Sequence, residues 1–133
     1  MQYAIDEAKK AEGEVPVGAV IVDKNGNIIG SGKNQMITKC DPTAHAEIEA
    51  IRNATAKIGS YRLVDCSIYV TLEPCPMCSF AIKLARIKNI YTGSQTNINT
   101  DNHKPIIYDN IMESECSQLL YDFFKQKRLL TNS

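Results

Sequence analysis

The sequence has no excess of either charge and no apolar run long enough to span a bilayer. Lysine plus arginine and aspartate plus glutamate each number 15 in 133 residues, so the formal net charge is zero. A neutral chain has no overall attraction to nucleic acid or to a lipid surface, so a polyanion would have to bind a local basic patch. We expect no membrane-spanning segment, and the N-terminus lacks the basic-then-apolar layout of a signal peptide.

Repeats, low-complexity stretches and linkers are also absent before about residue 93. Hydrophobic residues make up 44% and charged residues 23%, which is typical of soluble globular chains. The length suits one compact domain, so we predict a single domain over residues 1–133. Five cysteines without a secretion signal favour a reducing compartment, with thiols as metal ligands or core residues. The predicted location is cytoplasmic.

Helical and strand patterns alternate along the chain. The hydrophobic spacing predicts helices over residues 2–12, 44–58 and 76–86, and a final amphipathic helix containing Cys116, Leu119, Leu120, Phe123 and Phe124. Strands are expected at residues 15–22, from residue 28, and at 67–72, 90–92 and 106–108. The expected buried faces are Ile48, Ile51, Ala54 and Ile58 in the second helix and Met77, Ala81, Leu84 and Ala85 in the third. This order predicts a layered α/β domain with a mixed sheet flanked by helices.

Two motifs carry metal-binding residue types at the starts of predicted helices. The first is Thr43-Ala44-His45-Ala46-Glu47, and the second is Glu73-Pro74-Cys75-Pro76-Met77-Cys78. Free backbone N–H groups and the positive end of the helix dipole favour thiolate at such positions. Cys75 and Cys78 can reach one ion from a single helical turn, and His45 adds an imidazole nitrogen. Three protein ligands leave one tetrahedral position for water, as in catalytic zinc sites.

Glu47 lies two residues from His45, where it can take a proton from that water without binding the metal. The joint pattern, His-x-Glu followed by Pro-Cys-x-x-Cys, is similar to the signature of zinc nucleobase deaminases. Two other interpretations stay open at this point. A structural zinc module would need a fourth ligand, from Cys40 or Cys66. A thiol oxidoreductase would use Cys75 and Cys78 as a redox pair.

Five stretches resemble the cytidine deaminase superfamily and, within it, the tRNA-specific adenosine deaminases. They are EVPVGA at 14–19, DPTAHAEI at 41–48, YRL at 61–63, YVTLEPCPMC at 69–78 and FFKQKR at 123–128. The resemblance implies a three-layer α/β/α fold with a mixed five-stranded sheet, a homodimer, and hydrolysis of adenosine to inosine at the wobble position of a tRNA anticodon stem-loop. It also implies one Zn²⁺ per chain on His45, Cys75 and Cys78, with Glu47 moving protons. Asn34 and the Ala46 backbone N–H would orient the base.

A guanine deaminase, or another deaminase of free bases or nucleosides, is the alternative within the same superfamily. Guanine deaminases resemble this chain in the stretches GKN at 32–34, DPTAHAE and EPCPMC. The segment SQTNINTDNHK at 94–104 departs from the tRNA deaminase pattern, because it is shorter and lacks the charges and glycines expected there. Cys40, Cys66 and Cys116, which lie outside the motifs, are expected to be small buried hydrophobic residues.

Overall fold

A five-stranded mixed sheet forms the centre of the molecule in a computed structural model, which describes residues 1–95 and 106–131. The strands are β1 (Gly18–Val22), β2 (Ile28–Lys33), β3 (Ser67–Leu72), β4 (Asn89–Ser94) and β5 (Ile106–Tyr108). The helices are α1 (Gln2–Lys9), α2 (Ala46–Ile58), α3 (Pro76–Leu84) and α4 (Glu113–Thr131). Every element predicted from the sequence is present, and most boundaries differ by a few residues.

The sheet has the order β2-β1-β3-β4-β5. β1 pairs antiparallel with β2 and β3, whereas β4 is parallel to both β3 and β5. The β1–β2 hairpin turns at Asp23, whose carboxylate accepts hydrogen bonds from the backbone N–H groups of Asn25 and Asn27. These bonds close the turn over the polar segment Asp23-Lys24-Asn25-Gly26-Asn27, and this turn ends β1.

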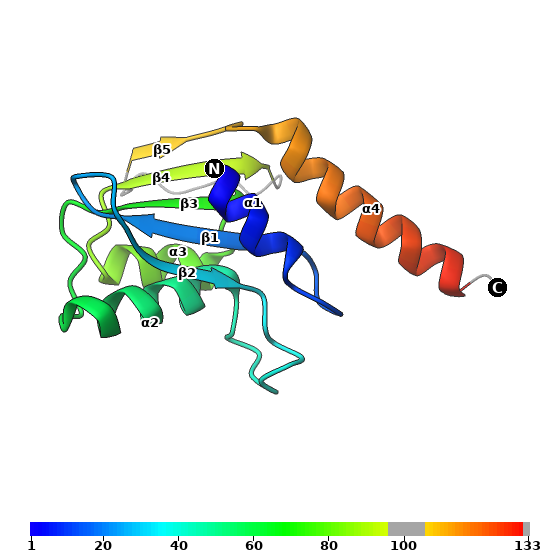
Figure 1. The fold of residues 1–133 in the computed structure, drawn as a ribbon, viewed down its shortest axis with the longest axis horizontal. Helices are drawn as coiled ribbons and strands as arrows, with labels where there is room; N and C mark the ends of the chain where they lie inside the picture. Colours follow the sequence, from blue (N-terminus) through cyan, green and yellow to red (C-terminus); the bar gives the residue numbers. More distant parts are fainter. Residues whose placement is uncertain (96–105, 132–133) are drawn as a thin grey trace.

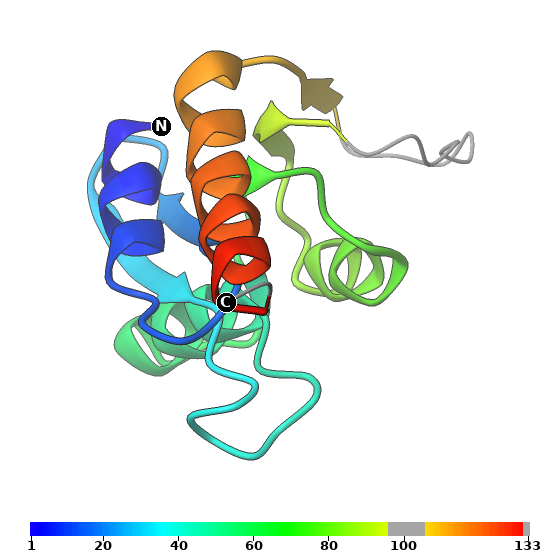
Figure 2. The same ribbon diagram turned by 90° about the vertical axis from the view of Figure 1, so that its right-hand side faces the viewer.

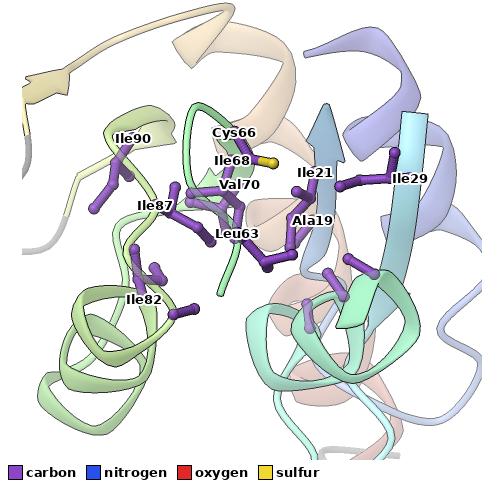
Figure 3. Packing of buried hydrophobic residues seen from close by; sticks show 14 of the residues in the cluster. Ala19, Ile21, Ile29, Leu63, Cys66, Ile68, Val70, Ile82, Ile87 and Ile90 are labelled. Carbon is purple, nitrogen blue, oxygen red and sulfur yellow. The ribbon is translucent and has the colours of Figure 1, made fainter. Parts of the chain in front are cut away.

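Helices cover both faces of the sheet, which gives the three-layer α/β/α arrangement expected from the resemblance. α2 and α3 lie on one face, and α1 and α4 lie on the other (Figures 1 and 2). The main hydrophobic core fills the space between the sheet and the α2–α3 layer (Figure 3). Its fully buried large side chains include Ile21, Leu63, Ile68, Val70 and Ile82.

The buried face of α2 differs from the prediction. Ala54 is fully buried as predicted, but so are Ala46 and Ala50, whereas Ile48 and Ile51 are only partly buried and Ile58 is exposed. The reason lies in β2: a Cβ on Gly30 would be 2.6 Å from the Ala50 carbonyl oxygen. A Cβ on Gly32 would be 2.4 Å from the Ala46 carbonyl oxygen. Glycine on the strand and alanine on the helix therefore let the two backbones approach closely, and the larger isoleucines lie to the side.

The buried face of α3 was also predicted only in part. Ala85 is buried and Ala81 is partly buried, but Met77 and Leu84 are exposed. Cys78 and Ile82 are the residues of this helix that are buried. The helix is therefore rotated so that the second cysteine points inward, and apolar side chains on its opposite side are left in solvent.

α4 matches the predicted amphipathic pattern where it packs on the sheet. Cys116 is buried against Gly93, while Phe124 is about half exposed. The difference arises because the C-terminal half of the helix projects past the sheet (Figure 1). None of the helices in the described part of the chain combines the length and apolar character needed to cross a membrane.

Candidate metal centre and active site

The three predicted ligands come together where two helices begin. His45 is the N-cap of α2 and Cys75 is the N-cap of α3, each with extended backbone and no side-chain cap of its own. Both side chains are thus free to turn toward each other across the interface between the helices. Cys78, one turn into α3, is fully buried beneath them. Among the described residues these three form the group of His, Cys, Asp and Glu side chains able to share a metal ion.

The distances between the donor atoms fit zinc. The Sγ atoms of Cys75 and Cys78 lie 3.7 and 3.5 Å from Nδ1 of His45. Zn–S and Zn–N bonds of about 2.3 and 2.0 Å at a tetrahedral angle place sulfur and nitrogen about 3.5 Å apart. Nδ1 is therefore the imidazole atom that would bind. Two thiols and one imidazole form a donor set suited to zinc, and it leaves one tetrahedral position to a further ligand.

Burial shapes the acid–base properties of this centre. Burial, together with the nearby Glu47 and Cys75, raises the pKa of the Cys78 thiol. A bound cation would act in the opposite direction, because it favours the thiolate form of its ligands. Burial also raises the pKa of Glu47, although its own backbone N–H and the Cys78 thiol act in the opposite direction.

Glu47 lies in the first turn of α2 and is 4% exposed. Its carboxyl group is within hydrogen-bonding reach of the Cys78 thiol, so it borders the metal cluster without belonging to it. Because burial raises the pKa of Glu47, its carboxylate is a stronger base than an exposed one, which suits it to accept a proton. The structure thus brings the predicted proton carrier to the predicted ligands.

Asn34 is joined to the same centre through the backbone of α2. Its Oδ1 accepts a hydrogen bond of 3.0 Å from the Ala46 N–H, and its Nδ2 donates one of 2.9 Å to the Val15 carbonyl. The Asn34 side chain is 6% exposed. Asn34 and Ala46, the two residues expected to orient a base, are therefore neighbours, and the Ala46 N–H holds the asparagine amide in place.

The remaining cysteines do not complete a closed metal site. Cys40 and Cys66 lie outside the cluster of His45, Cys75 and Cys78. Cys66 and Cys116 are buried as expected, but Cys40 is exposed, so the prediction that it fills the core is wrong. Cys40 has a positive φ of 50° in the tight turn that precedes α2, and this turn carries its side chain outward.

Sequence reasoning gave no role to Glu14, although its carboxylate is almost fully buried. Its oxygens accept hydrogen bonds of 2.9 and 3.1 Å from the backbone N–H groups of Ile37 and Thr38. Those donors lie 23 and 24 residues further along the chain. The only local signal was an acidic residue directly before an apolar strand, which does not reveal its partners.

Comparison with known proteins identifies relatives over most of the chain. The family model for the cytidine and deoxycytidylate deaminase zinc-binding region matches residues 1–94, which include all three candidate ligands and Glu47. The tRNA-specific adenosine deaminase of Haemophilus influenzae is 46% identical, over 96% of this chain and 83% of the relative. That of Bacillus subtilis is 39% identical, over 96% of this chain and 88% of the relative.

Solved structures of deaminases are also similar to this chain. A structure from a study of A-to-I editing by tRNA:A34 deaminases at the wobble position has a TM-score of 0.83 and 39% identity. The match covers 90% of this chain and 97% of that one. A guanine deaminase from Bacillus subtilis is 43% identical with a TM-score of 0.66, but it covers 71% of this chain and 61% of its own.

Proposed function

The chain belongs to the cytidine and deoxycytidylate deaminase family and, within it, to the tRNA-specific adenosine deaminases. We therefore propose that it converts adenosine to inosine at the wobble position of a tRNA. It is a zinc-dependent hydrolytic deaminase. The observation that carries the proposal is the buried Glu47 carboxyl beside a cluster of one imidazole and two thiols. We further propose that residues 1–133 form one deaminase domain.

The proposed reaction replaces the amino group on C6 of adenine with oxygen from water and releases ammonia. His45, Cys75 and Cys78 would hold one Zn²⁺. When bound, zinc lowers the pKa of water from about 15.7 to about 7, which supplies hydroxide at neutral pH. Glu47 takes a proton from water and passes it to the purine ring as the oxygen bonds to C6. It then takes the proton of the new C6 hydroxyl group and delivers it to the amino group, so that the C–N bond breaks, ammonia leaves and C6 keeps a carbonyl oxygen. The carboxyl returns to its starting state after each turnover.

Asn34 would orient the base through its second Nδ2 hydrogen, the one that it does not donate to the Val15 carbonyl. One Nδ2 hydrogen goes to the Val15 carbonyl and Oδ1 is engaged by Ala46, so the second Nδ2 hydrogen is available to a purine acceptor. Ala46 then acts by fixing Asn34. A held amide loses little conformational entropy when a ligand binds, which favours a defined orientation of the base.

The tRNA substrate is favoured over a free base by the extent of the similarity. The tRNA-specific relatives are 46% and 39% identical over 96% of the chain, which includes most of α4. The Bacillus subtilis guanine deaminase covers 71% of the chain, and a guanine deaminase that covers 92% of it is only 18% identical. The projecting half of α4 carries exposed Tyr121, Phe124 and Lys125, a combination of aromatic and basic side chains suited to nucleic acid (Figure 1). This local patch could bind phosphates although the net charge of the chain is zero.

We propose that the enzyme works as a cytoplasmic homodimer. Met77, Phe80 and Leu84 form an apolar stripe on the outer side of α3, with Phe80 66% and Leu84 73% exposed. The stripe starts next to Cys78, so a second copy of the chain seated on it would border the metal centre. All five cysteines are unpaired, which suits a reducing compartment.

Incubation of the purified zinc-loaded protein with two substrates tests the proposal. One is an anticodon stem-loop with adenosine at the wobble position, and the other is free guanine. We expect inosine in the stem-loop and no turnover of guanine, with Glu47→Ala as the inactive control. Turnover of guanine without turnover of RNA would move the assignment to the alternative substrate class.

A further inference from the structure

The buried carboxylate of Glu14 is a feature that the deamination chemistry does not use. It is 3% exposed, and its two oxygens accept hydrogen bonds from the consecutive backbone N–H groups of Ile37 and Thr38. Burial acts to raise the pKa of Glu14, but these N–H donors outweigh it and keep the pKa below the usual range. The side chain is therefore a buried anion that holds a distant piece of backbone.

That backbone is the turn between β2 and α2, which we call the 36–41 loop. The loop closes on itself through a 2.9 Å hydrogen bond from the Asp41 N–H to the Met36 carbonyl. It projects from the molecule in both views (Figures 1 and 2). Its residues 37–40, which we call its tip, are exposed, and Ile37 is 71% exposed. Lys39 in the same loop forms a 2.6 Å ion pair with Glu49, which lies on α2 and is 3% exposed. Two buried carboxylates thus tether a loop whose tip is open to solvent.

The segment that carries Glu14 also holds the residue proposed to orient the base. The Val15 carbonyl accepts from the Asn34 side chain, and the Val17 carbonyl accepts from the Asn34 N–H at 3.2 Å. The 36–41 loop follows Asn34 directly and leads to His45. Residues 14–17 therefore fix both the Asn34 amide, through the carbonyls of Val15 and Val17, and the exposed loop beside it, through the Glu14 side chain.

We propose that Glu14 is a positioning residue for a polynucleotide substrate, fixing the 36–41 loop so that its tip meets the nucleotides that flank the reacting adenosine. This inference rests on the proposed function. A loop already ordered before binding loses less conformational entropy when RNA arrives, so its tethers contribute to affinity. A free base, held at Asn34 and the metal centre, would not extend to the tip. The role of Glu14 is therefore specific to a substrate longer than one nucleoside.

The test compares Glu14→Gln with the native enzyme. Glutamine keeps the size of the side chain, but its NH₂ group faces a backbone N–H donor, so one tether is lost. We expect the KM for the stem-loop to rise about tenfold, with a much smaller change in kcat and one zinc retained per chain. Amide hydrogen exchange within residues 36–41 should become faster. Glu12→Gln is the matched control, because Glu12 is an exposed acid two residues earlier, and it should change none of these quantities.

Stem-loop affinity is also measured in a Glu47→Ala background, where binding does not depend on turnover. Weaker binding after Glu14→Gln, by about tenfold, supports the inference when it accompanies faster exchange in the loop. Unchanged affinity overturns it. A fall in kcat and in zinc content with unchanged KM also overturns it, because Glu14 would then stabilise the fold without positioning the RNA. If the native enzyme makes no inosine, the proposed function fails, and the affinity comparison still decides whether Glu14 positions the loop for RNA.

Discussion

At the scale of single residues, position in the structure separates the roles of chemically identical side chains. Glu47, Glu14 and Glu49 are all acids that are less than 5% exposed. Glu47 borders the thiol cluster, Glu14 binds backbone N–H groups, and Glu49 pairs with a lysine. Only the first is placed to exchange protons with a substrate. The other two hold the 36–41 loop through hydrogen bonds and an ion pair.

Replacing Glu47 with glutamine should remove turnover and leave the metal in place. General acid–base catalysis contributes about 10²–10⁴-fold, and the amide cannot accept a proton from water. The ligands His45, Cys75 and Cys78 are unchanged, so zinc should stay at one per chain. Single-turnover deamination of the stem-loop and metal analysis of the same preparation measure both quantities. A variant that keeps its rate would exclude Glu47 as the proton carrier.

The cysteines should differ sharply in reactivity toward a thiol reagent. Cys40 is exposed and should react quickly in the folded zinc-loaded protein. Burial raises the pKa of Cys116 to about 11, and burial also raises the pKa of Cys66, so both thiols should stay protonated and slow to react. Colorimetric titration should give one fast thiol, and Cys40→Ser should abolish it. If Cys40→Ser also lost zinc, a closed four-ligand site would replace the catalytic one.

At the scale of the elements, the close contact between β2 and α2 determines how the second helix packs. Small residues on both sides bring the helix backbone onto the sheet, and this places the N-terminus of α2 beside α3. His45 and Cys75 meet because both helices begin at the same edge. A change in this contact would therefore affect the metal centre as well as the core.

Gly30→Ala should destabilise the fold by about 1–3 kcal/mol, because the added Cβ would lie 2.6–2.7 Å from atoms of Ala50 and Ala54. Most of those atoms are backbone, which cannot rotate away. Urea unfolding followed by circular dichroism measures the loss. Ser31→Ala, the next residue on the same strand with its side chain on the other face, should change the unfolding free energy by less than about 0.5 kcal/mol. Equal effects of the two changes would show that the helix can move without penalty.

At the scale of the whole molecule, the apolar stripe on α3 leaves hydrophobic surface next to the metal centre. Phe80→Glu with Leu84→Glu should convert the proposed dimer to a monomer, because charged side chains at an apolar contact would lose hydration without gaining partners. Analytical ultracentrifugation of the zinc-loaded protein measures the mass. Tyr3→Glu, an exposed aromatic residue on the opposite layer, should leave the mass unchanged. A monomeric native protein would remove the basis for this interface.

Features that depend on residues close together in the sequence were predicted correctly, whereas features that depend on distant residues were not. The element order follows from patterns a few residues long, and the structure reproduces it in nine helices and strands across the described ranges. The candidate metal ligands were also predicted from local patterns, because each motif places them within one turn of a helix start. Predictions of buried faces in α2 and α3 were partly wrong, since hydrophobicity at Ile58 and Leu84 does not reveal which side meets the sheet.

The sequence by itself determined which chemistry is possible: one imidazole, two thiols and an acid, each tied by short spacing to a helix start. The tertiary structure alone decided which side of each helix is buried, that Asn34 is held by Val15 and Ala46, and that Glu14 tethers the 36–41 loop. The physical reason is that these contacts join residues 12 to 24 positions apart. No local periodicity encodes such a pairing, which exists only once the sheet has brought the segments together.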